Sequence, residues 1–350
     1  MTTASPATRM GGPSVSPGAR PRVMVLRRAD RPLGGDIYEE MIAQCLRGAC
    51  DVVDFASPRA NGIGRYWNTI RTIRDVRRQV PRRAVDVVVL NQDAALMRPR
   101  SRAKRVVMLH HIDYSCTLMG WVYAALRPRL YRVLAEADAV VVPGRFWRDA
   151  LQTRGVRNVH IIPNGFNVEQ FSVDHRDVEA FRLRHGLTGK PIIYLGTTGR
   201  QKGGAEAYRI LQRFDAHFVV TGPAPAPVPR VRHLRLAYRE YLQLLAASTV
   251  AVTMSQFDEG WCRVAHEAMA CGTPVVGSGR GGMRELLEDG GQCVCPEFAA
   301  LPAAVEPLLR DPGFRDRMRS DGIAYGRRFT LERFTRAWTE LITRLVEVGS

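Results

Sequence analysis

Two glutamates with the chemistry to hold sugar hydroxyls, Glu259 and Glu267, stand on either side of a predicted helix start. The helix that follows ends at Gly272, and after a short β-branched strand a second helix starts at Gly281–Gly282. Glycine-rich helix N-termini accept diphosphates, because free N–H groups and the positive end of the helix dipole both face the anion. Nearby carboxylates accept hydrogen bonds from hydroxyls. The segment is therefore suited to bind a nucleotide sugar.

The same segment resembles the C-terminal signature of the retaining glycosyltransferases of family 4. The family pattern is Glu, seven residues and Glu, then Ala-Met-Ala-Cys-Gly-Thr-Pro-Val-Val and Gly-Gly-x-x-Glu, and all of it lies between Glu259 and Glu285. The resemblance implies an α/β chain of the GT-B fold, in which two Rossmann-like doubly wound domains face a central cleft. It also implies transfer of a sugar from a nucleoside diphosphate to an acceptor hydroxyl, with the anomeric configuration retained.

The resemblance also assigns roles to residues of the second half of the chain. It implies that Glu259 contacts the donor sugar and that Glu267 contacts the ribose hydroxyls. The further donor-binding candidates lie between the two glutamates and around the second glycine-rich turn: Gly260, Trp261, Cys262, Arg263, Gly281, Gly282 and Glu285.

A second glycine-rich loop follows the predicted strand Pro191–Gly196 and precedes a helix. The family pattern there is Gly-Arg, about four residues, and Lys-Gly. Lys202 keeps the register with Gly196, which puts Thr197 at the arginine position, whereas a shorter loop makes Arg200 the counterpart. Both alignments select Arg200 and Lys202 as the cations for the phosphate, because a strand end, a glycine-rich turn and a helix start coincide.

The start of the chain has the strand, loop and helix that open a Rossmann-like domain. A short strand, Arg22–Leu26, leads through a turn-rich loop with Gly34–Gly35 into a helix over Ile37–Leu46. The resemblance implies that Gly34 and Gly35 belong to a loop over the donor phosphates and the acceptor.

Two histidines follow another buried strand, predicted over Arg105–Leu109. Ligands of open α/β sheets bind beyond the carboxyl ends of the strands. The resemblance places a histidine at this strand end near the anomeric carbon, with His110 favoured and His111 as the alternative.

The chain departs from the family pattern near two other turns. Gly144 stands where Ser is usual, and Asn167 stands where Asp is usual. Both departures affect local capping more than chemistry.

Composition and segmentation predict two domains in the 350 residues. We expect a disordered leader over residues 1–20, an acceptor domain over 21–186 and a nucleotide-sugar domain over 187–330. The amphipathic helix at 331–350 is expected to return to the first domain, as is common in GT-B enzymes. The leader lacks the apolar core of a signal peptide, and the seven cysteines are scattered, so a cytoplasmic protein with reduced thiols is expected.

The expected chemistry needs a stabilised leaving group and no cofactor. Arg200 and Lys202, together with backbone N–H groups near Trp261 and Gly281, are candidates to hold the charge of the departing phosphate. The sequence has no Asp-x-Asp pair for a divalent metal, and the resemblance implies that protein cations take its place. A UDP-sugar donor is favoured and a GDP-sugar is the alternative.

The sequence does not distinguish between three classes of acceptor: a small natural product, a glycan and a lipid-linked acceptor. The net charge is +17, and residues 1–186 hold 30 Lys and Arg against 17 Asp and Glu. This excess favours an anionic partner such as a phospholipid surface or a lipid-linked phosphate. The arginine-rich pattern over 63–80 is expected to be the solvated face of a domain helix, and a helix that lies on an anionic membrane is the alternative. Nucleic acid is not expected, because aromatic residues do not interleave with the basic ones. A catalytically inactive GT-B subunit, or a protein that binds anionic surfaces or nucleic acid, is the alternative.

Overall fold

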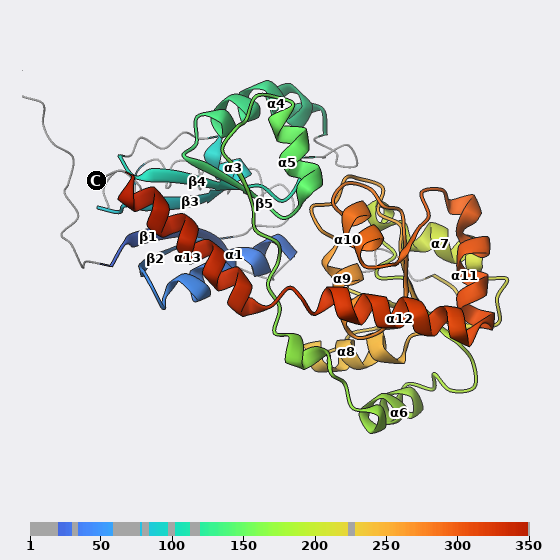
Figure 1. The fold of residues 1–350 in the computed structure, drawn as a ribbon. Helices are drawn as coiled ribbons and strands as arrows, with labels where there is room; N and C mark the ends of the chain where they lie inside the picture. Colours follow the sequence, from blue (N-terminus) through green and yellow to red (C-terminus); the bar gives the residue numbers. More distant parts are fainter. Residues whose placement is uncertain are drawn as a thin grey trace, which may run out of the picture.

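The computed structural model describes residues 20–29, 34–58, 78, 84–96, 102–112, 120–222 and 228–348. They form two six-stranded sheets in separate lobes, each surrounded by helices (Figure 1). Every strand pairing is parallel. Parallel strands need crossover connections, and sequence segments between these strands supply helices that cover the sheets. The expected pair of doubly wound α/β domains is confirmed.

The first sheet has the strand order β2-β1-β3-β4-β5-β6. Its strands are β1 Arg22–Ala29, β2 Asp51–Pro58, β3 Val87–Asn91, β4 Lys104–Met108, β5 Ala139–Val142 and β6 Val159–Ile161. The helices around it are α1 Gly34–Leu46, α3 Gln92–Ala95, α4 Gly120–Ala135, α5 Arg145–Gln152 and α13 Leu331–Glu347.

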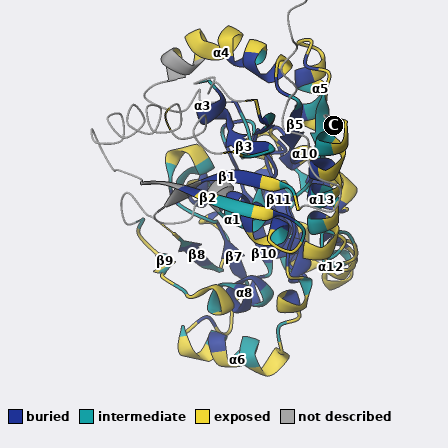
Figure 2. Ribbon diagram, turned by 90° about the vertical axis from the view of Figure 1, so that its left-hand side faces the viewer, coloured by how far each residue is buried: buried dark blue, intermediate teal, exposed yellow. Residues whose placement is uncertain are grey.

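The alternation of side chains along β4 shows why this sheet is covered on both faces. Val106 and Met108 belong to the core formed with α1 and α13. Val107 and Leu109 face the other way, into the core formed with α4 and α5. A segment buried on both sides must be apolar at every position, which explains the hydrophobic run from Val106 to Leu109 after the half-buried Lys104 and Arg105. Figure 2 shows the strands buried between helices that keep exposed outer faces.

The second sheet has the order β12-β11-β10-β7-β8-β9. Its strands are β7 Ile192–Tyr194, β8 His217–Thr221, β9 Val231–Leu234, β10 Val250–Thr253, β11 Val275–Gly277 and β12 Cys293–Val294. The α-helices are α6 His175–Arg184, α7 Gly204–Leu211, α8 Tyr238–Ala247, α9 Arg263–Ala270, α10 Met283–Asp289, α11 Leu301–Arg310 and α12 Pro312–Gly326. Short 3-10 turns are η2 Val168–Phe171, η3 Arg200–Lys202 and η4 Phe298–Ala300.

The chain passes between the lobes twice, and the two passages lie side by side. The backbone N–H of Phe166 donates to the carbonyl of Phe329 over 2.8 Å, and Leu331 N–H donates to the carbonyl of Phe166 over 3.0 Å. After the second passage α13 lies along the first lobe, against α1 (Figure 1). Phe171 and Phe181 already pack in the core of the second lobe, although they precede position 186.

Two sequence predictions differ from the structure or lie outside it. Gly34 and Gly35 form the first turn of α1 rather than a loop ahead of it, so this helix begins three residues before the predicted start. The arginine-rich segment 63–80 lies outside the described residues, apart from Arg78. None of the described helices is both long enough and apolar enough to cross a membrane.

The packing of α13 predicts the effect of a core substitution. Trp338 is fully buried, and its ring contacts Tyr38 edge-on and Phe334 at a tilt. We expect Trp338→Ala to lower the free energy of unfolding by about 3 to 5 kcal/mol, because it leaves a cavity between α13 and the sheet. Urea unfolding followed by circular dichroism measures the change. Glu340→Ala, on the exposed face of the same helix, should change it by less than about 0.5 kcal/mol, and equal losses in both variants would contradict the assigned packing.

Candidate active site

A polar cluster of the second lobe lies at the carboxyl ends of β7 and β10. These neighbouring strands form the point where the connections of the sheet change direction, because β7 leads outward to β8 and β10 leads outward to β11. Ligands of doubly wound sheets bind at such a switch point. The loop after β7 contains Lys202 and the loop after β10 contains Glu259. Two segments 57 residues apart are thereby joined at one edge.

Lys202 and Glu259 form an ion pair at this edge. The Lys202 ammonium donates to Oε1 of Glu259, and the Ser255 hydroxyl donates to the same oxygen. Glu259 is only 7% exposed, so its carboxylate depends on these partners. The Lys202 ammonium also lies 4.7 Å from the centre of the Phe257 ring. Burial alone would lower the pKa of Lys202, but the adjacent Glu259 carboxylate outweighs it and raises that pKa, which keeps the side chain cationic.

The glycine-rich turn before α10 lies directly against the loop with Glu259. The N–H of Gly282 donates to the carbonyl of Glu259 over 2.9 Å. A Cβ on Gly282 would lie 2.0 Å from the carbonyl oxygen of Gly260, so no other residue fits without moving the backbone. Gly281 pairs with Glu259 in a parallel bridge. The predicted residues Gly260, Gly281 and Gly282 are therefore brought together beside the ion pair.

Glu267 forms a second polar group on α9. Its Oε1 accepts from Arg263 Nε over 2.8 Å and from the Tyr238 hydroxyl over 3.3 Å. Burial raises the pKa of Glu267, while the Arg263 guanidinium and neighbouring tyrosine hydroxyls oppose that rise. Tyr238 is 44% exposed, so this end of the group faces solvent. A carboxylate held by a cation and a phenol at the rim is suited to bind vicinal hydroxyls.

Cys262 lies between Glu259 and Glu267 in the sequence. It is the N-cap residue of α9 and has an unusual backbone conformation. Its φ is +59°, a left-handed value that non-glycine residues rarely adopt. Burial, followed by the charge of Glu259, raises the pKa of its thiol to about 12. The side chain is therefore a neutral thiol, and the strained backbone is the more informative feature, because such residues gather at binding sites.

The first lobe contributes the predicted histidines at the end of β4. A Cβ on Gly260 would lie 2.4 Å from the carbonyl oxygen of His110, so the backbone of His110 lies against the Glu259 loop. The His110 ring packs edge-on against Tyr38 at 5.1 Å, and His111 lies 5.2 Å from the Phe257 ring. The His111 ring and the His110 backbone therefore lie against the second lobe at the switch-point edge, whereas the His110 ring packs on α1 of the first lobe.

Gln92 holds this histidine turn in place and was not predicted. Its Nε2 donates to the carbonyl of His111 over 2.7 Å, and its Oε1 accepts from His110 N–H over 3.3 Å. The only signal in the sequence is that Gln92 follows a buried strand, β3. Ser255, Phe257 and Tyr238 were missed for the same reason, because each makes its contact through the fold rather than within a motif.

Three other predicted site residues do not contact the Lys202–Glu259 pair. Trp261 is 6% exposed and turns into the protein, where its Nε1 donates to Nδ1 of His266 over 2.9 Å. The Glu285 carboxylate contacts the N-terminus of α5 in the first lobe. The Arg200 side chain is exposed and forms no ion pair or side-chain hydrogen bond with the described residues. Arg200 shares the η3 turn with Lys202, so it is available to an anion there.

Two family models match the chain, one on each lobe. The model for Glycosyltransferase Family 4 matches residues 18–170, and the model for Glycosyl transferases group 1 matches residues 233–325. The chain belongs to the group 1, family 4-like glycosyltransferases. Glu259 and Glu267 lie within the matched part of the second lobe, and Lys202 precedes that part in the sequence.

Curated relatives match part of their own length. The α-maltose-1-phosphate synthase of Mycolicibacterium smegmatis is 29% identical in an alignment 249 positions long, which covers 61% of this chain and 62% of that protein. A GDP-mannose-dependent α-mannosyltransferase of Mycobacterium tuberculosis is 26% identical over 158 residues, 43% of this chain and 42% of that protein. The chain thus spans less than two thirds of the length of these relatives.

Solved structures confirm the fold. Sucrose-phosphate synthase from Thermosynechococcus elongatus superposes with a TM-score of 0.78 at 17% identity, covering 94% of this chain and 100% of that chain. Anabaena HepE, solved in complex with UDP-glucose, gives a TM-score of 0.75 at 18% identity and covers 93% and 100%. The GT-B fold of this glycosyltransferase is therefore established, and its substrates are considered below.

The Trp261–His266 contact leads to a prediction on pH. Nε2 of His266 donates to the carbonyl of Gly326 over 2.8 Å, and burial lowers the pKa of His266 from 6.5 to about 3. The unfolded chain therefore takes up a proton between pH 6.5 and 3 that the folded protein does not. Stability should fall as the pH decreases through this window, by up to about 1.4 kcal/mol per pH unit from this group.

Urea unfolding of wild type and His266→Gln at pH 7.5, 6.0 and 5.0 isolates this contribution, because other titrating groups are common to both. We expect the wild type to lose more stability than the variant on acidification. An equal loss of unfolding free energy in both proteins on acidification would show that His266 is not held neutral in the folded protein.

Proposed function

We propose that this glycosyltransferase moves a sugar from a nucleoside diphosphate sugar to a hydroxyl of an acceptor, with retention at the anomeric carbon and without a metal. The observation that carries the proposal is the Lys202–Glu259 pair at the switch point of the second sheet. A cation there can bind the diphosphate of the donor, and a carboxylate beside it can accept hydrogen bonds from the sugar hydroxyls.

Stabilisation of the leaving group would come from three sources. Lys202 and the exposed Arg200 share one turn, and α10 begins at Met283 after two glycines. Breaking the bond between the sugar and the diphosphate leaves negative charge on the β-phosphate. Fixed cations and N–H groups that face that charge lower the barrier without reorganising. This supports a reaction in which protein groups do the work of a divalent ion.

The hydrogen bonds to the Glu259 carboxylate support retention without a covalent intermediate. Its Oε1 already accepts hydrogen bonds from Lys202 and Ser255, so it is held as a hydrogen-bond acceptor and not as a free nucleophile. In same-face attack the acceptor oxygen bonds to the anomeric carbon as the bond to the β-phosphate breaks. The acceptor proton passes to the departing phosphate oxygen. No covalent enzyme intermediate is needed.

A UDP-sugar is the favoured donor, with a GDP-sugar as the alternative. A relative uses GDP-mannose by name, and a structure of similar fold was solved with UDP-glucose. A thermal-shift panel of UDP, GDP and ADP with their sugars tests the class, because a ligand at a hundred times its Kd adds about 2.7 kcal/mol of stability. We expect one nucleoside diphosphate to raise the Tm by several degrees. No shift with any of them would refute the proposal.

Two substitutions test the roles of the ion pair. Lys202→Met and Glu259→Gln should each lower release of nucleoside diphosphate from the donor by about ten- to a hundredfold or more, because each removes a charge-assisted hydrogen bond. Lys190→Met is the matched control, since Lys190 pairs with Asp215 before β7, at the opposite edge of the sheet. Unchanged turnover in the folded Lys202 or Glu259 variant would refute these roles. A wild type that binds donor without turnover would indicate an inactive subunit.

A further inference from the structure

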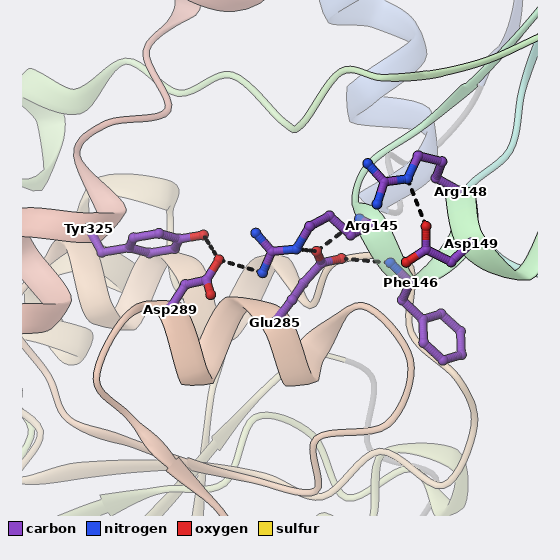
Figure 3. Close-up of polar contacts among 7 residues, drawn as sticks. All are labelled: Arg145, Phe146, Arg148, Asp149, Glu285, Asp289 and Tyr325. Carbon is purple, nitrogen blue, oxygen red and sulfur yellow. Dashed lines mark hydrogen bonds and ion pairs between the residues drawn. The ribbon is translucent and has the colours of Figure 1, made fainter.

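The helix α5 of the first lobe is capped by a residue of the second lobe. Its N-cap residue, Gly144, has no side chain to offer the first N–H groups. The Glu285 carboxylate of α10 accepts from Arg145 N–H over 2.8 Å and from Phe146 N–H over 3.3 Å (Figure 3). Helix N-termini have unpaired donors and a positive dipole end, so a carboxylate there is stabilising. The cap is therefore supplied across the lobes.

Gly144 is the residue that makes room for this cap. A Cβ at this position would lie 1.9 Å from Oε1 of Glu285. The family pattern has serine here, which caps a helix with its own hydroxyl. A serine at 144 would therefore require the Glu285 carboxylate to shift from this position. The bare backbone at Gly144 allows the carboxylate to approach the N-terminus of α5 as closely as it does.

Arg145 extends the contact along α10. Its Nε lies 3.3 Å from Oε2 of Glu285, and its Nη2 lies 2.8 Å from Oδ2 of Asp289 (Figure 3). The Tyr325 hydroxyl of α12 donates to the same Asp289 oxygen over 3.1 Å. Arg145 is half exposed, so its ion pairs are screened by solvent, whereas the Glu285 side chain is 11% exposed. The main strength of the contact lies in the two backbone hydrogen bonds to Glu285.

The first turn of α5 also reaches the loop that contains Glu259. Trp147 is 4% exposed, and its Nε1 donates to the carbonyl of Glu259 over 2.9 Å. The same loop touches the first lobe again where Gly260 lies against the carbonyl of His110. The backbone that presents the Glu259 carboxylate is therefore held by side chains and backbone of the other lobe.

We propose that α5 is an interdomain positioning element: Glu285 docks its N-terminus, and Trp147 then fixes the Glu259 loop for reaction. Glu285 and Trp147 are positioning residues that act through Glu259, and Glu285 does not itself contact the donor. The inference rests on the proposed function, because it assigns a role within that site. Lys202 and Glu267 both belong to the second lobe, so nucleotide binding should survive when the contact is broken.

Restoring the cap within α5 separates positioning from plain capping. Glu285→Ala removes the cap from the other lobe, and Gly144→Ser then supplies one in the same helix without a collision. We expect Glu285→Ala to lower both the Tm and the turnover, the latter by about tenfold. The double variant Gly144→Ser/Glu285→Ala should recover the Tm but keep the low turnover. Recovery of turnover together with the Tm would overturn the proposal.

Trp147→Phe tests the second contact, because it removes the Nε1 donor and keeps an aromatic ring in the core. It should lower turnover about fivefold and leave the Kd of the nucleoside diphosphate within about twofold of wild type. Arg148→Ala is the matched control on α5, since among the described residues Arg148 pairs with the adjacent Asp149 alone (Figure 3). Equal turnover in Trp147→Phe and wild type would overturn the role of Trp147.

Hydrogen exchange of the peptide that contains residues 259–262 gives a readout that needs no substrate. Faster exchange in Glu285→Ala, in the double variant and in Trp147→Phe supports the proposal, and unchanged exchange in all three overturns it. A wild type that binds no nucleotide sugar defeats the proposed function instead. The exchange measurement still decides whether the first lobe holds the loop.

Discussion

The buried carboxylate of Glu259 is the group on which the rest of the site depends. A charge at 7% exposure is costly unless it is paired and hydrogen-bonded, and here Lys202 and Ser255 both donate to one of its oxygens. Because Lys202 and Glu259 come from loops after different strands, the pair can form only if β7 and β10 are neighbours. The parallel sheet and its strand order therefore create the site.

The loop that presents Glu259 is also a contact between the lobes. Gly260 and Gly282 allow backbone to approach backbone so closely that a Cβ at either position would collide with a carbonyl oxygen. Trp147 from the first lobe donates to the Glu259 carbonyl. The two passages of the chain between the lobes lie side by side at Phe166 and Phe329, an arrangement suited to a hinge. Domain contact and site geometry are thus coupled through a few residues.

Much of this arrangement could be predicted from the sequence. Apolar β-branched runs such as Ala139–Val142 identify buried strands, and the signature from Glu259 to Glu285 identifies the fold and the cation–carboxylate site. The GT-B fold and the family are confirmed. The sequence patterns placed Lys202 in a loop after a strand and Glu259 beside a helix start, but they did not predict that the two side chains form an ion pair.

The rest could not be predicted, because it depends on contacts between distant segments. Spacing within the signature does not show that Trp261 turns inward to His266, or that Glu285 caps a helix 140 positions earlier in the chain. The absent serine at Gly144 looked like a lost cap, whereas the structure shows the cap supplied from the other lobe. The role of Gln92 could not be predicted for a related reason. A polar residue after a strand is common, and its hydrogen bonds to the backbone of His110 and His111 depend on the folded structure.

The most direct test of the central claim is a crystal structure of the protein with the nucleoside diphosphate that raises its Tm most. We predict the diphosphate within hydrogen-bond distance of Lys202 Nζ, beside the glycine-rich turn at Gly281–Gly282, with the ribose hydroxyls at Glu267. A nucleotide bound away from the Lys202–Glu259 edge, with both side chains free of it, would contradict the account.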